Sequence, residues 1–179
     1  MSCKKIGLLG GRGYVGQEII SLLNNNNDLN IGSVYSSSKA GQPVSMDASG
    51  EIIYQDLALE KIELGDEEAF ILALPNKKSQ QYVDLITNHN KEAIIVDLSS
   101  DHRFDKNWEY RIPELSDPVS LKKISNPGCY ASAMQFMIAP ILNILDGPVN
   151  LFGISGYSGA GASPNQRNNT ELLKDNILP

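Results

Sequence analysis

Short apolar runs alternate with amphipathic stretches along most of this chain. Near-continuous apolar runs are typical of strands that are buried on both faces of a sheet. Such runs lie at residues 5–9, 31–35, 70–74 and 93–98. Between them, residues 17–23 and 79–87 repeat their apolar positions with helical spacing. The alternation predicts an α/β fold, with a doubly wound, Rossmann-like and mostly parallel sheet.

The pattern changes in the last third of the chain. Residues 131–145 are apolar nearly all round, which predicts a helix buried in the core or at an interface, with a kink at Pro140. A further apolar run at 149–154 predicts a strand that opens a second α+β domain. We therefore expect one domain over residues 1–147 and the beginning of a second over residues 148–179.

Composition and charge argue against several classes of protein, including nucleic-acid-binding, membrane-bound and disulfide-rich proteins. The 179-residue chain is 41% hydrophobic and 20% charged, as is usual for a soluble globular protein. Its net charge of −6 argues against nucleic acid or an anionic membrane as a main partner. Two cysteines, Cys3 and Cys129, are too few for a disulfide framework and suit a reducing compartment. Without a signal-peptide pattern or an apolar run of membrane-spanning length, a cytoplasmic protein is expected.

A glycine-rich turn follows the first predicted strand. Gly10, Gly13 and Gly16 have the spacing G-x-x-G-x-x-G and lead into the first predicted helix. Strand, glycine turn and helix are the context in which a dinucleotide pyrophosphate meets a helix N-terminus. Many ordinary turns also contain glycine, so the cluster favours cofactor binding without requiring it.

The end of the second predicted strand bears on the choice of cofactor. An NAD-specific site carries an acid there to hold the ribose hydroxyls. Here Ser36, Ser37, Ser38 and Lys39 follow the strand instead. Hydroxyls and a cation suit a 2′-phosphate, which favours NADP, although the same residues could form an ordinary polar loop.

The candidate nucleophile is Cys129. It follows a Pro-Gly turn and precedes the long apolar helix, so its thiol is expected at a helix N-terminus. Free backbone N–H groups and the helix dipole favour the thiolate there, and the thiolate is the nucleophile. The alternative is a small, inert core cysteine.

A polar segment, residues 99–115, follows the strand at 93–98. It lies where doubly wound sheets bind ligands, and its Arg103 could grip a phosphate or a carboxylate. A surface ion pair with Asp101 or Asp105 is about as consistent with the spacing.

Several motifs then occur in a fixed order. Besides the glycine turn they are residues 74–76 (LPN), 97–104 (DLSSDHRF), 113–115 (PEL), 126–131 (NPGCYA) and 155–161 (SGYSGAG). Together they closely resemble the N-acetyl-γ-glutamyl-phosphate reductases, arginine-biosynthesis enzymes of the semialdehyde dehydrogenase group. The resemblance runs from residue 5 to residue 179. It implies that residues 1–147 form the NADP-binding domain and that residues 148–179 begin the catalytic and dimerisation domain.

This resemblance implies NADPH-dependent reduction of N-acetylglutamyl 5-phosphate to the 5-semialdehyde, with release of phosphate. The Cys129 thiolate would attack the acyl phosphate and form a thioester. Arg103 and Asn126 would bind the substrate. The implied cofactor contacts are Gly10, Arg12, Gly13, Tyr14, Val15, Gly16, Ser36, Ser38, Lys39, Leu74, Pro75, Ser99, Ser158 and Gly159. The implied partners are a small acyl phosphate and further copies of the chain, and no metal is implied.

Two features depart from the family pattern. Members often carry an arginine directly after the serines of the second strand, where this chain has Ser38 and Lys39. The family is also nearly twice as long, and its catalytic histidine lies in the second half. Neither His89 nor His102 stands at that position, so we expect an N-terminal fragment that is inactive alone.

Two other interpretations remain open from the sequence. A related reductase of the aspartate-semialdehyde or aminoadipyl type would use the same chemistry on a different acyl chain. A non-catalytic NADP-binding module, with Cys129 as a redox sensor, is the non-enzymatic alternative.

Overall fold

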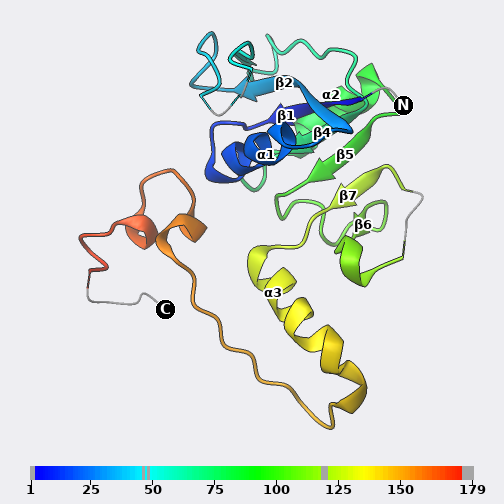
Figure 1. The fold of residues 1–179 in the computed structure, drawn as a ribbon, viewed down its shortest axis with the longest axis vertical. Coiled ribbons are helices and arrows are strands. Elements are labelled where there is room, and N and C mark those ends of the chain that lie inside the picture. The colour runs from blue at the N-terminus through cyan, green and yellow to red at the C-terminus, as the bar shows by residue number, and fades with distance from the viewer. Residues whose placement is uncertain (1–2, 46, 48, 118–120, 175–179) are drawn as a thin grey trace. The chain divides into compact units, whose positions relative to one another are not determined.

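The computed structural model describes residues 3–45, 47, 49–117 and 121–174. Seven strands form one sheet in the order β3-β2-β1-β4-β5-β7-β6 (Figure 1). The strands are β1 Lys4–Leu9, β2 Leu29–Ser36, β3 Tyr54–Asp56, β4 Ala69–Leu72, β5 Ile94–Asp97, β6 Glu109–Tyr110 and β7 Lys123–Ser125. Each neighbouring pair is parallel. The predicted doubly wound fold is confirmed, because the chain starts at β1 in the middle and winds outward in both directions.

Three α-helices accompany the sheet. They are α1 Tyr14–Asn24, α2 Gln80–His89 and α3 Cys129–Ile138. Short 3₁₀ helices follow at η1 Pro113–Leu115, η2 Ala139–Ile144, η3 Tyr157–Ala160 and η4 Gln166–Asn168. Ser79 is the residue before α2 and its backbone C=O accepts the first turn's N–H groups of Tyr82 and Val83.

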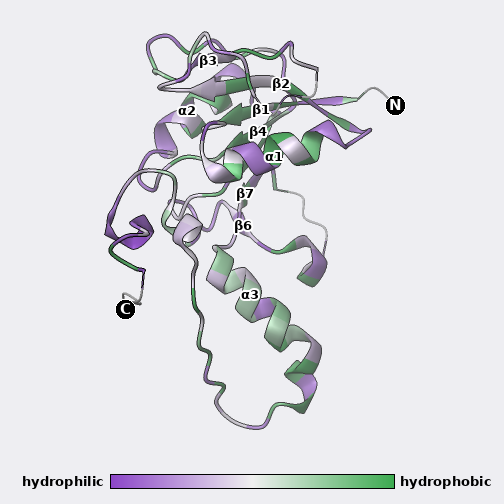
Figure 2. Ribbon diagram, turned by 60° about the vertical axis from the view of Figure 1, so that its left-hand side comes forward, coloured by the Kyte–Doolittle hydropathy of each residue, from purple (hydrophilic) through white to green (hydrophobic). Residues whose placement is uncertain are grey.

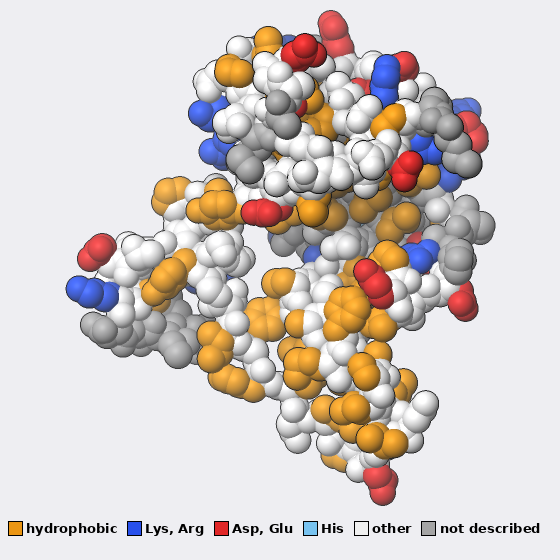
Figure 3. All heavy atoms as spheres, in the orientation of Figure 1, with side chains coloured by type: hydrophobic (Ala, Val, Ile, Leu, Met, Phe, Trp, Pro, Cys, Tyr) orange, Lys and Arg blue, Asp and Glu red, His pale blue; other side chains and the backbone are white. Residues whose placement is uncertain are grey.

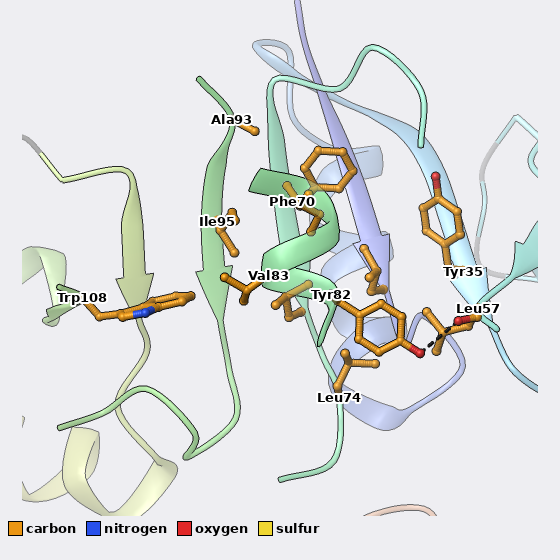
Figure 4. Packing of buried hydrophobic residues seen from close by; sticks show 12 residues of the cluster. Tyr35, Leu57, Phe70, Leu74, Tyr82, Val83, Ala93, Ile95 and Trp108 are labelled. Carbon is orange, nitrogen blue, oxygen red and sulfur yellow. Dashed lines mark hydrogen bonds between the residues drawn. The ribbon is translucent and has the colours of Figure 1, made fainter. Parts of the chain in front are cut away.

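Strand alternation divides the apolar side chains between the two faces of the sheet. Leu8 and Val34 join Ile20 of α1 in one buried cluster, while their neighbours Leu9 and Tyr35 enter the other. Figure 4 shows that second cluster, in which α2 packs on the sheet and the Tyr82 hydroxyl donates to the Leu57 carbonyl at 2.9 Å. A helix on each face buries the strands on both sides, as their continuous apolar runs indicated.

The polar segment at 99–115 has more structure than its sequence pattern suggests. It contains β6, whose residues Glu109 and Tyr110 pair with Ile124 and Ser125 of β7. A strand of this length has no detectable period, so sequence periodicity could not find it.

The last third of the chain differs in part from what its pattern predicts. The helix is interrupted near Pro140, as expected: the α-helix ends at Ile138 and continues as 3₁₀ turns from Ala139, because Pro140 cannot continue the α-helical hydrogen bonds. Neither α3 nor η2 contains a buried residue, so a position in the core is wrong, and the alternative of a helix at an interface stays a prediction. Figure 2 shows hydrophobic colouring around much of α3.

Residues 149–154 form no strand within the described part of the chain. The strand predicted there is therefore wrong, because a short apolar run does not by itself show whether a neighbouring strand is present to pair with it. The chain forms two compact units, Met1–Ile144 and Leu145–Pro179. Among the described residues, no helix has the length and apolar content that crossing a membrane requires.

Candidate active site

The carboxyl ends of the central parallel strands carry most of the candidate residues. The glycine turn follows β1, the Ser36–Lys39 turn follows β2, and the Arg103 loop follows β5. The Cys129 turn follows β7. Because the strands are parallel, these segments leave the sheet at the same edge, where open α/β sheets bind ligands.

Cys129 is the first residue of α3 and is exposed. Gly128 precedes the helix in an extended conformation, and the first turn contains no acidic residue. The thiol therefore lies among helix N–H groups that have no partner inside the helix, at the positive end of the helix dipole. An inert core cysteine is excluded by this exposure.

Arg103 lies against the residue that precedes Cys129. A Cβ atom placed on Gly128 would be 3.0 Å from Arg103 Nη1. Arg103 Nη2 donates to the Leu98 carbonyl at 3.4 Å, and its Nε is buried without a partner. The guanidinium thus touches the turn that carries Cys129, the predicted nucleophile.

The alternative of a surface ion pair does not apply to Arg103 in the described part of the chain. Asp101 instead accepts from the backbone N–H groups of Lys77 and Ser79, at 2.6 and 3.0 Å. Asp105 accepts from Asn107. Among the described residues, no carboxylate forms an ion pair with this guanidinium, which lies against the residue directly before Cys129.

Asp97 connects the segments that form the site. Its backbone carbonyl, at the end of β5, accepts from the Asn126 N–H at 2.8 Å and so positions the Cys129 turn. Its fully buried carboxylate accepts from the Ser79 hydroxyl and from both the N–H and the hydroxyl of Ser99. One residue thus ties α2, the Arg103 loop and the Cys129 turn to β5.

His102 completes this buried network. Its Nδ1 lies 2.6 Å from Asp97 Oδ2, and its Nε2 lies 3.0 Å from Gln80 Oε1. The ring stacks on Trp108 with centroids 4.0 Å apart. Both ring nitrogens of this buried histidine therefore face protein oxygens.

A second set of hydrogen bonds joins the loop after β4 to the loop after β5. Besides the Asp101 bonds, the Ser100 N–H donates to Asn76 Oδ1 at 3.1 Å. Burial alone would raise the pKa of Asp101, but the hydrogen bonds from Lys77 and Ser79 outweigh it and lower that pKa below its usual value. The LPN turn and the Arg103 loop are therefore held together.

The glycine turn is closely packed. Gly10 has a φ of 90°, and a Cβ there would lie 2.2 Å from the Ala73 carbonyl oxygen. At Gly13, by contrast, a Cβ would meet only the Gly10 carbonyl, at 3.7 Å. The first turn of α1 contains no acidic residue, and Arg12, Tyr14 and Val15 are exposed. This open helix N-terminus fits an anionic pyrophosphate.

The turn after β2 is built on Ser36. Its buried hydroxyl accepts from the N–H groups of Ser38 and Lys39, at 3.4 and 3.2 Å. Ser37, Ser38 and Lys39 are exposed and carry no negative charge. The donor set suits a phosphate better than the two hydroxyls of an unmodified ribose.

Ser158 and Gly159 belong to the other compact unit, where they form part of η3. The remaining predicted residues are in the first unit, at or beside the carboxyl ends of its strands. Sequence reasoning gave no role to Asp97 or Ser79. The sequence did contain a hint, because a predicted buried strand ends at Asp97 and Ser99 follows it. The pattern does not show, however, that the Asp97 carboxylate binds both Ser79 and Ser99.

Residues 5–124 match the profile of "Semialdehyde dehydrogenase, NAD binding domain", and residues 129–179 match "Semialdehyde dehydrogenase, dimerisation domain". An N-acetyl-gamma-glutamyl-phosphate reductase from Xanthomonas axonopodis is 43% identical, over 98% of this chain and 57% of the relative. One from Stenotrophomonas maltophilia is 42% identical, over 97% and 56%. The mitochondrial protein arg11 of Schizosaccharomyces pombe is 41% identical, over 98% and 21%. This chain therefore spans little more than half the length of the bacterial relatives.

Solved structures give the same fold. Aspartate semialdehyde dehydrogenase II from Vibrio cholerae, complexed with ASA, has a TM-score of 0.67 at 16% identity. The similarity covers 79% of this chain and 47% of that one. The aspartate semialdehyde dehydrogenase with NADP from Candida albicans has a TM-score of 0.62 at 16% identity, over 80% and 48%. At these identities the likeness establishes the architecture alone.

Proposed function

Because the chain belongs to the semialdehyde dehydrogenase family, we propose that it carries the cofactor-binding and nucleophile-bearing part of an NADPH-dependent acyl-phosphate reductase. The proposed substrate is N-acetylglutamyl 5-phosphate, since relatives 41–43% identical over nearly the whole chain include several named N-acetyl-gamma-glutamyl-phosphate reductases. One observation carries the proposal: the guanidinium of Arg103, without an ionic partner in the described part of the chain, lies against Gly128, directly before the exposed Cys129.

In this function, the Cys129 thiolate attacks the carbonyl carbon of the acyl phosphate. A carbon–sulfur bond forms, the carbon–oxygen bond to phosphate breaks, and the phosphate leaves with the bonding electrons. Arg103 binds the phosphate and stabilises its developing charge, because a guanidinium pairs well with phosphate oxygens. The product on the protein is a thioester.

The residues present fit NADPH, which when bound supplies the hydride that reduces the thioester. The turn from Gly10 to Gly16 would hold the pyrophosphate, and Ser36, Ser38 and Lys39 would hold the 2′-phosphate. Leu74, Pro75 and Ser99, which follow β4 and β5, would line the same edge of the sheet. Ser158 and Gly159 are proposed as further contacts near the nicotinamide.

We further propose a homo-oligomer, because residues 129–179 match a dimerisation-domain profile. A cytoplasmic location is proposed by similarity to the bacterial enzymes. The fungal relatives in the comparison bear mitochondrial names, so location can differ within the family.

Acyl transfer to Cys129 tests the function directly. The chain is mixed with N-acetylglutamyl 5-phosphate, and the acyl adduct is measured on the Cys129 peptide by mass spectrometry while phosphate release is followed. We expect one adduct on Cys129, none in Cys129→Ser, and acylation slowed roughly ten- to a hundredfold in Arg103→Gln. Equal modification of Cys3 and Cys129 would contradict the proposal. Aspartyl phosphate as a parallel substrate distinguishes the aspartate-semialdehyde type.

Cofactor preference is tested by titration of NADPH and NADH, monitored through the single tryptophan, Trp108. We expect tighter binding of NADPH, and loss of most of that preference in Lys39→Ala, because the variant removes a charge that would face the 2′-phosphate. Lys91→Ala, an exposed lysine beyond the far end of α2, is the matched control. Equal affinities for both cofactors would refute the NADP assignment without affecting the acyl-transfer test.

A further inference from the structure

We propose that His102 is a positioning residue: its contacts with Asp97, Gln80 and Trp108 hold the Arg103 guanidinium beside the Cys129 turn. The inference rests on the proposed function, since it concerns the residue that would bind the substrate phosphate. It assigns His102 no contact with substrate or cofactor.

The first argument is how firmly His102 itself is held. The side chain is only 3% exposed, and both of its ring nitrogens lie within hydrogen-bond distance of an oxygen. Its ring is nearly parallel to the Trp108 ring, with an interplanar angle of 14°. Asp97, to which it is joined, is fully buried at the end of β5. The ring thus fixes its own backbone to the central sheet.

The second argument is how weakly Arg103 is held by its own contacts. Within the described residues, its side chain makes one hydrogen bond, to the Leu98 carbonyl at 3.4 Å, and this is a long one. Its position must therefore come mainly from its backbone and from packing against Gly128. That backbone follows His102 directly in the chain, so the anchor is one residue away.

The third argument is that a residue needed only for stability at position 102 would not have to be a histidine. Buried polar pairs often add little net stability, because each partner must be removed from water. A phenylalanine could stack on Trp108 without that cost. A histidine that bonds at both nitrogens sets the direction of the loop as well as filling space, and we infer that direction to be its contribution.

The test uses two reagents that differ in charge. Iodoacetate and iodoacetamide alkylate the same thiolate, but only iodoacetate is attracted by a neighbouring guanidinium. The ratio of their rate constants at Cys129, read by mass spectrometry, reports whether Arg103 is in place, and Cys3 serves as an internal reference. Arg103→Gln is expected to lower this ratio about three- to tenfold, the effect of one nearby charge under partial screening.

His102→Phe is expected to lower the iodoacetate-to-iodoacetamide rate ratio at Cys129. The change in the logarithm of this ratio should be at least half of that produced by Arg103→Gln. The double variant His102→Phe/Arg103→Gln should match Arg103→Gln alone, because both changes act through one guanidinium. His102→Asn, which can still donate to Asp97, should recover part of the ratio. His89→Phe is the matched control, since His89 is exposed at the end of α2, where its Nε2 lies 2.8 Å from the Gly65 carbonyl oxygen.

A loss of stability by itself would slow or speed both reagents together and leave the ratio unchanged. If Arg103→Gln lowers the ratio and His102→Phe does not, the positioning role is refuted and the proposed function stands. If Arg103→Gln has no effect, the proposed role of Arg103 fails first. If both His102 variants fail to fold while Arg103→Gln folds, His102 is needed for the stability of the fold, and its positioning role is also refuted.

Discussion

At the scale of single residues, one glycine, Gly128, lies between the proposed nucleophile Cys129 and the Arg103 guanidinium. Gly128 has a φ of −69° and a ψ of 161°, a conformation open to any residue, so its backbone does not require glycine. Space is the tighter constraint, because a Cβ would lie 3.0 Å from Arg103 Nη1, closer than ordinary van der Waals contact. A side chain here would make the guanidinium shift by a few tenths of an ångström, and glycine leaves it in place against the residue that precedes Cys129.

Gly128→Ala should therefore impair acyl transfer more than stability. The added methyl makes the guanidinium shift by a few tenths of an ångström, and acylation of Cys129 by N-acetylglutamyl 5-phosphate is expected to slow roughly two- to tenfold. Gly65→Ala is a matched control, because its Cβ would meet Glu67 Oε2 at the same 3.0 Å but before β4, at the opposite edge of the sheet. A similar rate in both variants would refute the steric argument.

The Asp101 carboxylate gives the site a pH-dependent stabilising contact. Its pKa is lowered in the folded protein, so its contribution is fully present above the unfolded value and is lost as pH falls through the folded value. Asp101→Asn should lower the urea midpoint at pH 7, and this difference from the unsubstituted chain should shrink below about pH 4. Asp28→Asn, on an exposed turn, controls for loss of charge alone. A difference that is constant with pH would contradict this assignment.

At the scale of elements, the glycine turn fixes how α1 packs on β1. A Cβ on Gly16 would lie 2.6 Å from the Gly10 carbonyl oxygen and 2.7 Å from the Gly11 Cα. Both are backbone atoms, so neither can rotate away. The turn is also tied to α1 by the Gln17 side chain, which donates to the Gly11 carbonyl and, at 2.8 Å, to the Tyr54 hydroxyl.

Gly16→Ala is therefore expected to destabilise the fold by about 1–3 kcal/mol or more, because the range typical of overpacking applies here to backbone atoms that cannot move away. Gly13→Ala, in the same turn, should cost less than about 1 kcal/mol, because its Cβ meets only ordinary van der Waals contact. Urea unfolding followed by circular dichroism measures both. Equal losses would show that the turn tolerates no side chain anywhere.

At the scale of the whole molecule, α3 and η2 leave a large apolar surface in contact with water. Met137 is 62% exposed and Leu142 is 63% exposed, and hydrophobic side chains gather along this part of the chain in Figure 3. Exposed patches of this kind are typical of interfaces or of association-prone surfaces. This favours a chain that needs further contacts over a free-standing binding module.

We expect the 179-residue chain to self-associate at micromolar concentration in sedimentation velocity. Met137→Lys/Leu142→Lys should lower the associated fraction severalfold, because it places charge within the apolar surface. Leu22→Lys is the matched control, since Leu22 is 71% exposed but lies on α1. A monomeric chain that binds NADPH would instead support the non-enzymatic module.

The fold was predictable from the sequence because its strands are long enough to carry a period. The runs that became β1, β2, β4 and β5 were placed within two residues of their ends. The strands β6 and β7 were not predictable, because they are too short to show a period. The exposure of α3 was not predictable either, because the sequence of a helix that is apolar all round is the same whether the helix is covered or exposed. Pro140 indicated a break but not the change to 3₁₀ turns.

By itself, the sequence determined the alternating α/β order, the glycine turn, the single cysteine in a Pro-Gly-Cys turn, and the ordered motifs of the semialdehyde dehydrogenase family. These are local features, set by residue type and spacing. Only the tertiary structure decided that Arg103 lies against Gly128 and that Asp97 joins Ser79, Ser99, His102 and the Asn126 backbone. Those contacts depend on parallel strands that bring distant segments to one edge of the sheet, and periodicity along a chain does not report which side chains meet there.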